Sequence, residues 1–125
     1  MRDFTIHLTH KPGELGRVAN ALAKKGVNVR SLACMAVGTQ GLLRLIADDH
    51  ETARSALEEG RIHFEEKELV TVLLENQAGE VAVVADKLSN AGVNMEAVYV
   101  IGLSGDLVEL ALAVDDVKKA KKALE

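Results

Sequence analysis

The spacing of hydrophobic residues along this chain alternates between that of β-strands and that of α-helices. Residues 4–9 alternate apolar and polar, which predicts a strand with one buried face. Residues 15–22 repeat at helical spacing, and a glycine follows that can end a helix in a left-handed conformation. An apolar run at 29–37 and a second alternating stretch at 43–47 predict two more strands. Asp48-Asp49 then offers an N-cap for a second helix.

The same order of elements returns in the second half of the chain. Asp3–Asn28 aligns with Leu69–Asn94 at an offset of 66 residues, with 10 identities in 26 positions. After one inserted residue the match resumes at an offset of 67, pairs Asp48-Asp49 with Asp115-Asp116, and continues through a last predicted helix to Leu57 and Leu124. A repeat of this length predicts two copies of one folded unit, so a site exists twice or was kept in one copy. The predicted domains are residues 1–66 and 67–125.

The order of elements indicates an α+β fold. A short strand at Ile62–Glu65 completes the order βαββαβ, so we expect two ferredoxin-like units side by side, each an antiparallel sheet with its helices on one face. The second copy ends at Glu125, after its second helix, and has no fourth strand of its own. We therefore expect Ile62–Glu65 to be shared, pairing with residues 4–9 and forming a hairpin with Leu69–Leu74 through Glu66-Lys67. The result would be one continuous sheet with all four helices on one side.

Composition excludes several classes of function. The net charge is −4 and only three residues are aromatic, so the stacking platforms of nucleic-acid binders are missing. No apolar stretch approaches the roughly 20 residues that cross a bilayer, so we expect no membrane partner. The single Cys34 lies in an apolar run, and we expect it to be a small buried hydrophobe in a cytoplasmic protein.

No constellation of residues indicates catalysis. The chain has no Ser/His/Asp set, phosphate loop or metal-ligand spacing, and its paired carboxylates are explained as helix caps. His7 and His10 are an odd number of residues apart, so they point to opposite faces of a strand and do not chelate one metal. We expect a protein that is not an enzyme, with no cofactor and no metal.

The loop after the first strand carries a recognisable motif. His10-Lys11-Pro12-Gly13-Glu14-Leu15, followed by Gly26-Val27-Asn28-Val29, resembles the ACT domain, a small-molecule-binding regulatory module. The second copy, Asn76–Val81 with Gly92–Met95, is similar but lacks the proline. Together the copies resemble a stand-alone tandem ACT protein. This resemblance implies an amino acid bound between the loop and a neighbouring unit, with contacts from His10, Gly13 and Asn28 and from Asn76, Gly79 and Asn94.

The residues suit that chemistry, although each has a structural alternative. The start of a helix offers unpaired N–H groups for a carboxylate. The two glycines either let a ligand approach closely or permit a tight turn. The two asparagines after Gly-Val either bind the ligand or satisfy turns, and His10 either binds or is a solvent-exposed loop residue. Because serine-binding members of the family carry an asparagine at the loop position, Asn76 favours a small polar amino acid at the second site.

Two functions remain open at this point. The first is a non-catalytic regulatory module that binds an amino acid and controls a partner enzyme of amino-acid metabolism. The alternative is a structural or protein-interaction module that has lost its ligand. Residues 32–37 and 98–103 are apolar on both faces although they belong to predicted edge strands, so we expect a homodimer or a higher homo-oligomer.

Overall fold

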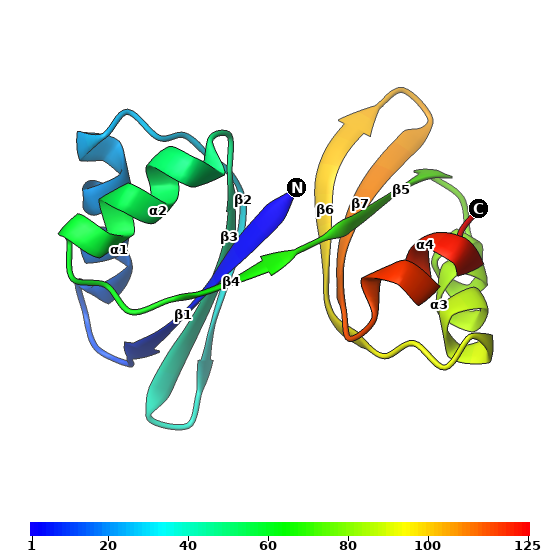
Figure 1. The fold of residues 1–125 in the computed structure, drawn as a ribbon, viewed down its shortest axis with the longest axis horizontal. Helices are drawn as coiled ribbons and strands as arrows, with labels where there is room; N and C mark the ends of the chain where they lie inside the picture. The colour runs from blue at the N-terminus through cyan, green and yellow to red at the C-terminus, as the bar shows by residue number, and fades with distance from the viewer. The chain divides into compact units, whose positions relative to one another are not determined.

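The computed structural model describes all of residues 1–125 (Figure 1). The chain divides into two compact units, Arg2–Lys67 (the N-terminal unit) and Glu68–Glu125 together with Met1 (the C-terminal unit). The elements, in chain order, are β1 (Arg2–Thr9), α1 (Glu14–Lys24), β2 (Val29–Val37), β3 (Gln40–Ala47), α2 (His50–Glu59), β4 (Glu65–Glu68), β5 (Val70–Glu75), α3 (Glu80–Asn90), β6 (Met95–Ser104), β7 (Leu107–Val114) and α4 (Val117–Ala123).

The N-terminal unit is a four-stranded sheet in the order β2-β3-β1-β4, with α1 and α2 on one face (Figure 1). β3 runs antiparallel to both β1 and β2, and Phe4 is paired with Leu45. The core lies between this face and the helices. Its largest members are fully buried, and the residues that contribute most are Phe4, Ile6, Leu43, Leu45, Val18, Leu22 and Leu57. Each such side chain contributes roughly 1.5–3 kcal/mol of hydrophobic free energy.

The C-terminal unit repeats this plan with one strand fewer. Its sheet has the order β5-β7-β6, and α3 and α4 lie on one face (Figure 1). A separate core forms from Val70, Val84, Leu88, Val93, Leu110, Leu112, Val114 and Ala120. The predicted α+β fold with two ferredoxin-like units is therefore confirmed.

The predicted shared strand is wrong. The two units have separate sheets, and β4 is hydrogen-bonded to β1 but not to β5. β4 also begins at Glu65, where the predicted strand was to end. The predicted turn residues Glu66-Lys67 lie inside β4, because this pair lacks the glycine or asparagine that a tight hairpin turn requires. Only Leu69 separates β4 from β5, which leaves no room for a two-residue turn. One continuous sheet bearing four helices is excluded.

The inserted residue of the second copy is a β-bulge. In β2, Cys34 pairs with Leu43 and Ala36 with Gly41 without interruption. In β6, by contrast, the register shifts between Val100 and Gly102. Ile101 is therefore the extra residue, and the two copies are in register again beyond it.

Each unit contains two adjacent aspartates that accept different hydrogen bonds, and the arrangement is the same in both units. The second of each pair caps a helix: Asp49 accepts from the Thr52 N–H at 3.1 Å, and Asp116 accepts from the Lys119 N–H. The first of each pair instead accepts a main-chain N–H from the start of the second strand. Asp48 accepts from Asn28 at 3.1 Å, and Asp115 accepts from Asn94 at 2.9 Å.

Helix ends show where the chain needs a left-handed residue. α1 and α3 are followed by Gly26 and Gly92, with φ of 70° and 73°. α2 ends differently, because Arg61 is the residue with positive φ, at 55°, although Gly60 precedes it. A Cβ on Gly60 would lie 3.3 Å from the Cβ of Ala21. Gly60 thus permits close approach of α1 and α2, while Arg61 takes the strained conformation.

Candidate functional site

The loops that lead into α1 and α3 have the same backbone structure. The His10 N–H donates to the Thr39 carbonyl at 3.2 Å, and the Asn76 N–H donates to the Asp106 carbonyl at 2.7 Å. These bonds attach each loop to the hairpin between the second and third strands of its unit. His10 and Asn76 are exposed. Their place next to the hairpin brings the loop, the helix start and the end of the edge strand together.

Gly13 and Gly79 are the residues immediately before α1 and α3. Their φ values are 91° and 92°, a left-handed conformation that favours glycine, so the tight-turn explanation for both is supported. A Cβ on either would have nothing within 4 Å, so the space in front of both is open. No side chain caps α1 or α3, whereas aspartates cap α2 and α4. The first N–H groups of α1 therefore keep their capacity to bind an anion, whereas the Glu80 N–H at the start of α3 donates to the Gln77 carbonyl at 3.4 Å.

Charge distinguishes the two loops. In the N-terminal unit Glu14 Oε2 lies 3.1 Å from Arg17 Nη2, and Glu14 Oε1 lies 3.6 Å from Lys11 Nζ. The hydrogen bond from Arg17, with its positive charge and that of Lys11, lowers the pKa of Glu14 against the opposing effect of desolvation. The corresponding residues of the C-terminal unit are Gln77 and Val83, so Glu80 has no such partners on its helix.

A hollow of about 170 Å³ lies beside the start of α1. Its lining combines the loop, the first turn of α1 and the end of β2, from Leu8, Thr9, His10, Lys11, Glu14, Leu15, Cys34, Met35, Ala36 and Gly41. Strand pairing aligns Leu8, Gly41 and Ala36 in one row across β1, β3 and β2. Because Leu8 belongs to the buried core, this row faces the helices and forms the apolar floor of the hollow.

Asn28 and Asn94 do not meet the other predicted residues of their own unit. Asn28 precedes β2 next to Ala47, whereas His10 lies at the other end of β3, beside Gln40. Seven residues of strand separate these ends, roughly 23 Å. The backbones of both asparagines are held by Asp48 and Asp115, which supports the structural explanation for these positions. A site that contains both His10 and an Asn28 side chain requires a second unit.

The sequence did not reveal the floor of the hollow. Cys34 is exposed, not buried as predicted, because β2 is an edge strand whose outer half is left uncovered. Gly41 and Ala36 carried no motif. Only the register of β1, β3 and β2 could have revealed this floor, because that register brings Leu8, Gly41 and Ala36 together. The turn at Gly38-Thr39 fixes the register between β2 and β3.

Comparison with known proteins identifies the family. The family model described as an ACT domain pair matches residues 1–124. The chain belongs to this family. The predicted resemblance is therefore confirmed, and both units are ACT units. A search of curated proteins finds no match.

Solved structures resemble the ACT pair over nearly its whole length. Protein BT0572 from Bacteroides thetaiotaomicron is 26% identical with a TM-score of 0.87, covering 98% of this chain and 85% of that one. The ligand-free regulatory subunit of aspartate kinase from Thermus thermophilus is 18% identical with a TM-score of 0.68, covering 98% and 87%. Aspartokinase alpha and beta subunits are 15% identical with a TM-score of 0.66, covering 98% and 88%. Because the two aspartate kinase structures are only 18% and 15% identical to this chain, their similarity shows a shared fold.

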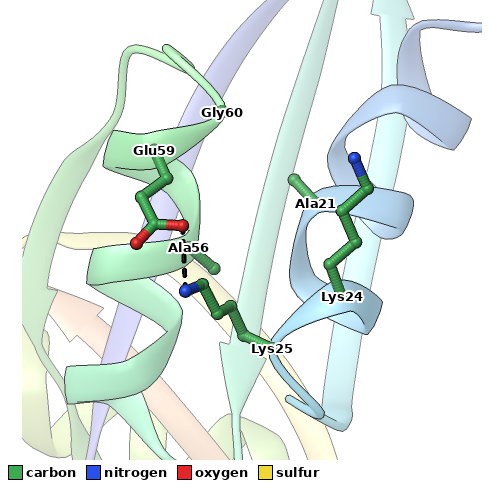
Figure 2. A pocket seen from close by; sticks show the side chains of 6 residues that line it. All are labelled: Ala21, Lys24, Lys25, Ala56, Glu59 and Gly60. Carbon is green, nitrogen blue, oxygen red and sulfur yellow. Dashed lines mark ion pairs between the residues drawn. The ribbon is translucent and has the colours of Figure 1, made fainter.

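A second hollow in the first ACT unit contains none of the predicted site residues. It lies between α1 and α2 and measures about 150 Å³ (Figure 2). Figure 2 shows the ion pair that crosses it, from Lys25 Nζ to Glu59 Oε2 at 2.9 Å. Ala21, Ala56 and Gly60 are the small residues of its lining, so this hollow follows from the close approach of the two helices.

Neither a metal-binding cluster nor a membrane-spanning helix is found in the ACT pair. No group of three or more His, Cys, Asp or Glu side chains is arranged to hold a metal ion. None of the four helices has the length and apolar character needed to cross a membrane.

Proposed function

We propose that this ACT pair is a non-catalytic regulatory module that binds an amino acid beside the start of α1. The observation that carries the proposal is the hollow at an uncapped helix start. The unpaired N–H groups and the positive end of the helix dipole suit a carboxylate, and the apolar floor suits a side chain. His10 and Gly13 contribute from the loop. Asn76 and Gly79 occupy the corresponding places in the second unit.

The proposed assembly is a homodimer or a higher homo-oligomer. β2 and β6 are edge strands with exposed apolar side chains, among them Met35 at 56% and Leu103 at 71% exposure. Surface of this kind is ordinarily covered by a partner. A neighbouring unit would also bring Asn28 or Asn94 to a loop that its own unit keeps distant. Light scattering at micromolar concentration tests the assembly, and a monomer contradicts it.

The proposed role is control of a partner enzyme of amino-acid metabolism in the cytoplasm. The regulatory subunits of aspartate kinase have the same fold, which supports a regulatory place for this chain. A ligand shifts such a partner only if it binds one state of the assembly better than another. Binding beside an edge strand meets that requirement, because docking of units changes the surroundings of the hollow.

A thermal-shift screen of the twenty amino acids tests ligand binding. A ligand at 100 times its Kd stabilises the folded state by about 2.7 kcal/mol, and we expect at least one amino acid to raise the melting temperature at millimolar concentration. His10→Ala should reduce that shift, because His10 lines the hollow. Asn76→Ala, at the corresponding loop position, is the matched control for loop truncation. No stabilisation by any amino acid contradicts the proposal.

The alternative is a protein-interaction module without a ligand. It is favoured by the C-terminal unit, where Val98, Val100 and Leu103 are exposed along one edge strand. A dimer that forms at micromolar concentration and ignores every amino acid would establish this alternative.

A further inference from the structure

The two units differ in one row of side chains beside the predicted loops. In the N-terminal unit the row is Leu8–Gly41–Ala36. In the C-terminal unit the corresponding row, paired in the same way across β5, β7 and β6, is Leu74–Val108–Leu103. The leucine of the first strand is unchanged. The other two positions change from small to large residues.

The small residues account for the hollow in the N-terminal unit. Val108 packs against its unit's core, so its side chain fills the space that Gly41 leaves open. Leu103 extends the filled row onto the edge strand, where it is largely exposed. The side chains of the C-terminal row contain six more carbon atoms than those of the N-terminal row. Since an apolar cavity of about 150 Å³ holds a molecule of the size of benzene, the hollow of about 170 Å³ accommodates an aliphatic side chain.

We propose that the N-terminal unit alone holds the ligand, and that this ligand is an amino acid with an aliphatic side chain lying on the Leu8–Gly41–Ala36 row. This inference rests on the proposed function and adds the restriction to one unit and the class of ligand. It replaces the small polar amino acid that Asn76 favoured in the sequence, because Asn76 belongs to the unit whose row is filled.

The lining separates the two ends of such a ligand. Leu8, Gly41, Ala36 and Leu15 provide apolar contacts, while the polar part of the lining comes from Thr9, His10, Lys11 and Glu14. A hydroxyl, amide or charge on the ligand's side chain would lose water against the apolar floor without gaining a hydrogen bond there. Discrimination by an apolar pocket is typically about 10- to 200-fold per methylene, so leucine should bind at least tenfold more tightly than serine.

Calorimetric titration of the full chain with leucine, isoleucine, valine, methionine and serine tests the inference. Gly41→Val and Ala36→Leu place the residues of the C-terminal row in the N-terminal unit. Each should weaken aliphatic binding by about tenfold or more, since each adds three carbons to the hollow. Leu103→Ala, at the position corresponding to Ala36, is the matched control and should leave the Kd unchanged.

A second readout locates the ligand. Cys34 is the only cysteine, is exposed and lines the hollow, so a thiol reagent reports on this place alone. At one fixed protein concentration, leucine should slow the modification of Cys34 and serine should not. Ala36→Leu should remove the protection.

The outcomes separate this inference from the proposed function. Binding of polar amino acids in preference to aliphatic ones overturns the inference and leaves the function intact. A Leu103→Ala variant that loses binding as strongly as Ala36→Leu overturns the assignment to the N-terminal unit. No binding by any amino acid overturns both proposals. Melting curves without ligand verify that Gly41→Val folds. If Gly41→Val does not fold, the binding measurement on Ala36→Leu, whose substitution lies at an exposed edge position, tests the inference alone.

Discussion

Beside α1 the chain leaves a hollow over Gly41, and beside α3 it fills the corresponding place with Val108. Much of the surrounding backbone is the same in both units: the left-handed glycine, the bond from the loop to the hairpin and the paired aspartates all recur, and the bulge at Ile101 in β6 is the difference. A repeated loop and helix start therefore do not imply a repeated hollow. At this place the two small residues of the N-terminal row leave a hollow, and the two large residues of the C-terminal row present an apolar edge.

The units also differ in how their second helices are attached. Arg54 of α2 forms two hydrogen bonds with Glu66, at 3.0 and 2.7 Å, and Arg2 Nε lies 3.3 Å from the same carboxylate. In the C-terminal unit the counterpart of Arg54 is Lys121, which makes a single exposed contact of 3.3 Å with Glu68. The second helix of the N-terminal unit is therefore the more strongly anchored of the two.

Matched truncations of the two cores give the largest expected effect. Leu45→Ala and Leu112→Ala remove corresponding leucines, each at most 2% exposed. Each should lower the free energy of unfolding by about 2–5 kcal/mol, from lost burial and the cavity left behind. Because the units have separate cores, hydrogen exchange should show the loss mainly in the unit that carries the substitution. An equal loss of protection in both units for either variant would contradict this independence.

Removal of the carboxylates of β4 gives an intermediate effect. Glu66→Gln should destabilise the protein by on the order of 1 kcal/mol at pH 7, between the values of exposed and buried pairs. Glu68→Gln, the matched control, should change the free energy of unfolding by less than about 0.5 kcal/mol. Urea denaturation of both variants measures the difference. Equal effects would show that the second arginine contact and the bidentate geometry contribute nothing.

The same pair predicts a pH dependence. The hydrogen bond from Arg54, with the charges of Arg54 and Arg2, lowers the pKa of Glu66 below its ordinary 4.5. A lowered pKa in the folded state means that the stabilisation is complete above pH 4.5 and is lost as the pH falls through the folded-state value. The wild-type protein should therefore lose more stability on acidification than Glu66→Gln does. Parallel acid titrations of the two proteins would contradict this assignment.

Substitutions at helix ends should change stability by no more than the loss of the Glu66 carboxylate does. Arg61→Gly should stabilise the N-terminal unit by about 0.5 kcal/mol, because glycine adopts a φ of 55° without steric strain. Gly26→Ala and Gly92→Ala should each destabilise by about 1 kcal/mol at corresponding positions, with φ of 70° and 73°. Melting temperatures provide the test. A destabilised Arg61→Gly would show that the arginine side chain contributes more than its backbone strain removes.

Local chemistry made most of the fold predictable. Asp49 and Asp116 were recognised as helix caps, and Gly26 and Gly92 as left-handed ends, because each acts within a few residues of its own position. The shared strand was wrong because Glu65–Glu68 is polar and short, and nothing in its composition distinguishes pairing with β1 from pairing with β5. The row at Gly41 depends on the register of three strands. No short stretch of the sequence reveals this register, because the paired residues lie far apart in the chain.

The bulge at Ile101 shows where this architecture tolerates a change in chain length. β6 has a neighbour on one side only, so an extra residue there disturbs one ladder instead of two. The ends of the strand stay in place, since Asp115 holds the main chain before β6 and the hairpin at Ser104 restores the pairing after it. An outer strand of this architecture therefore tolerates one extra residue, whereas the inner strands β1, β3 and β7 have a ladder on each side that an insertion would disturb.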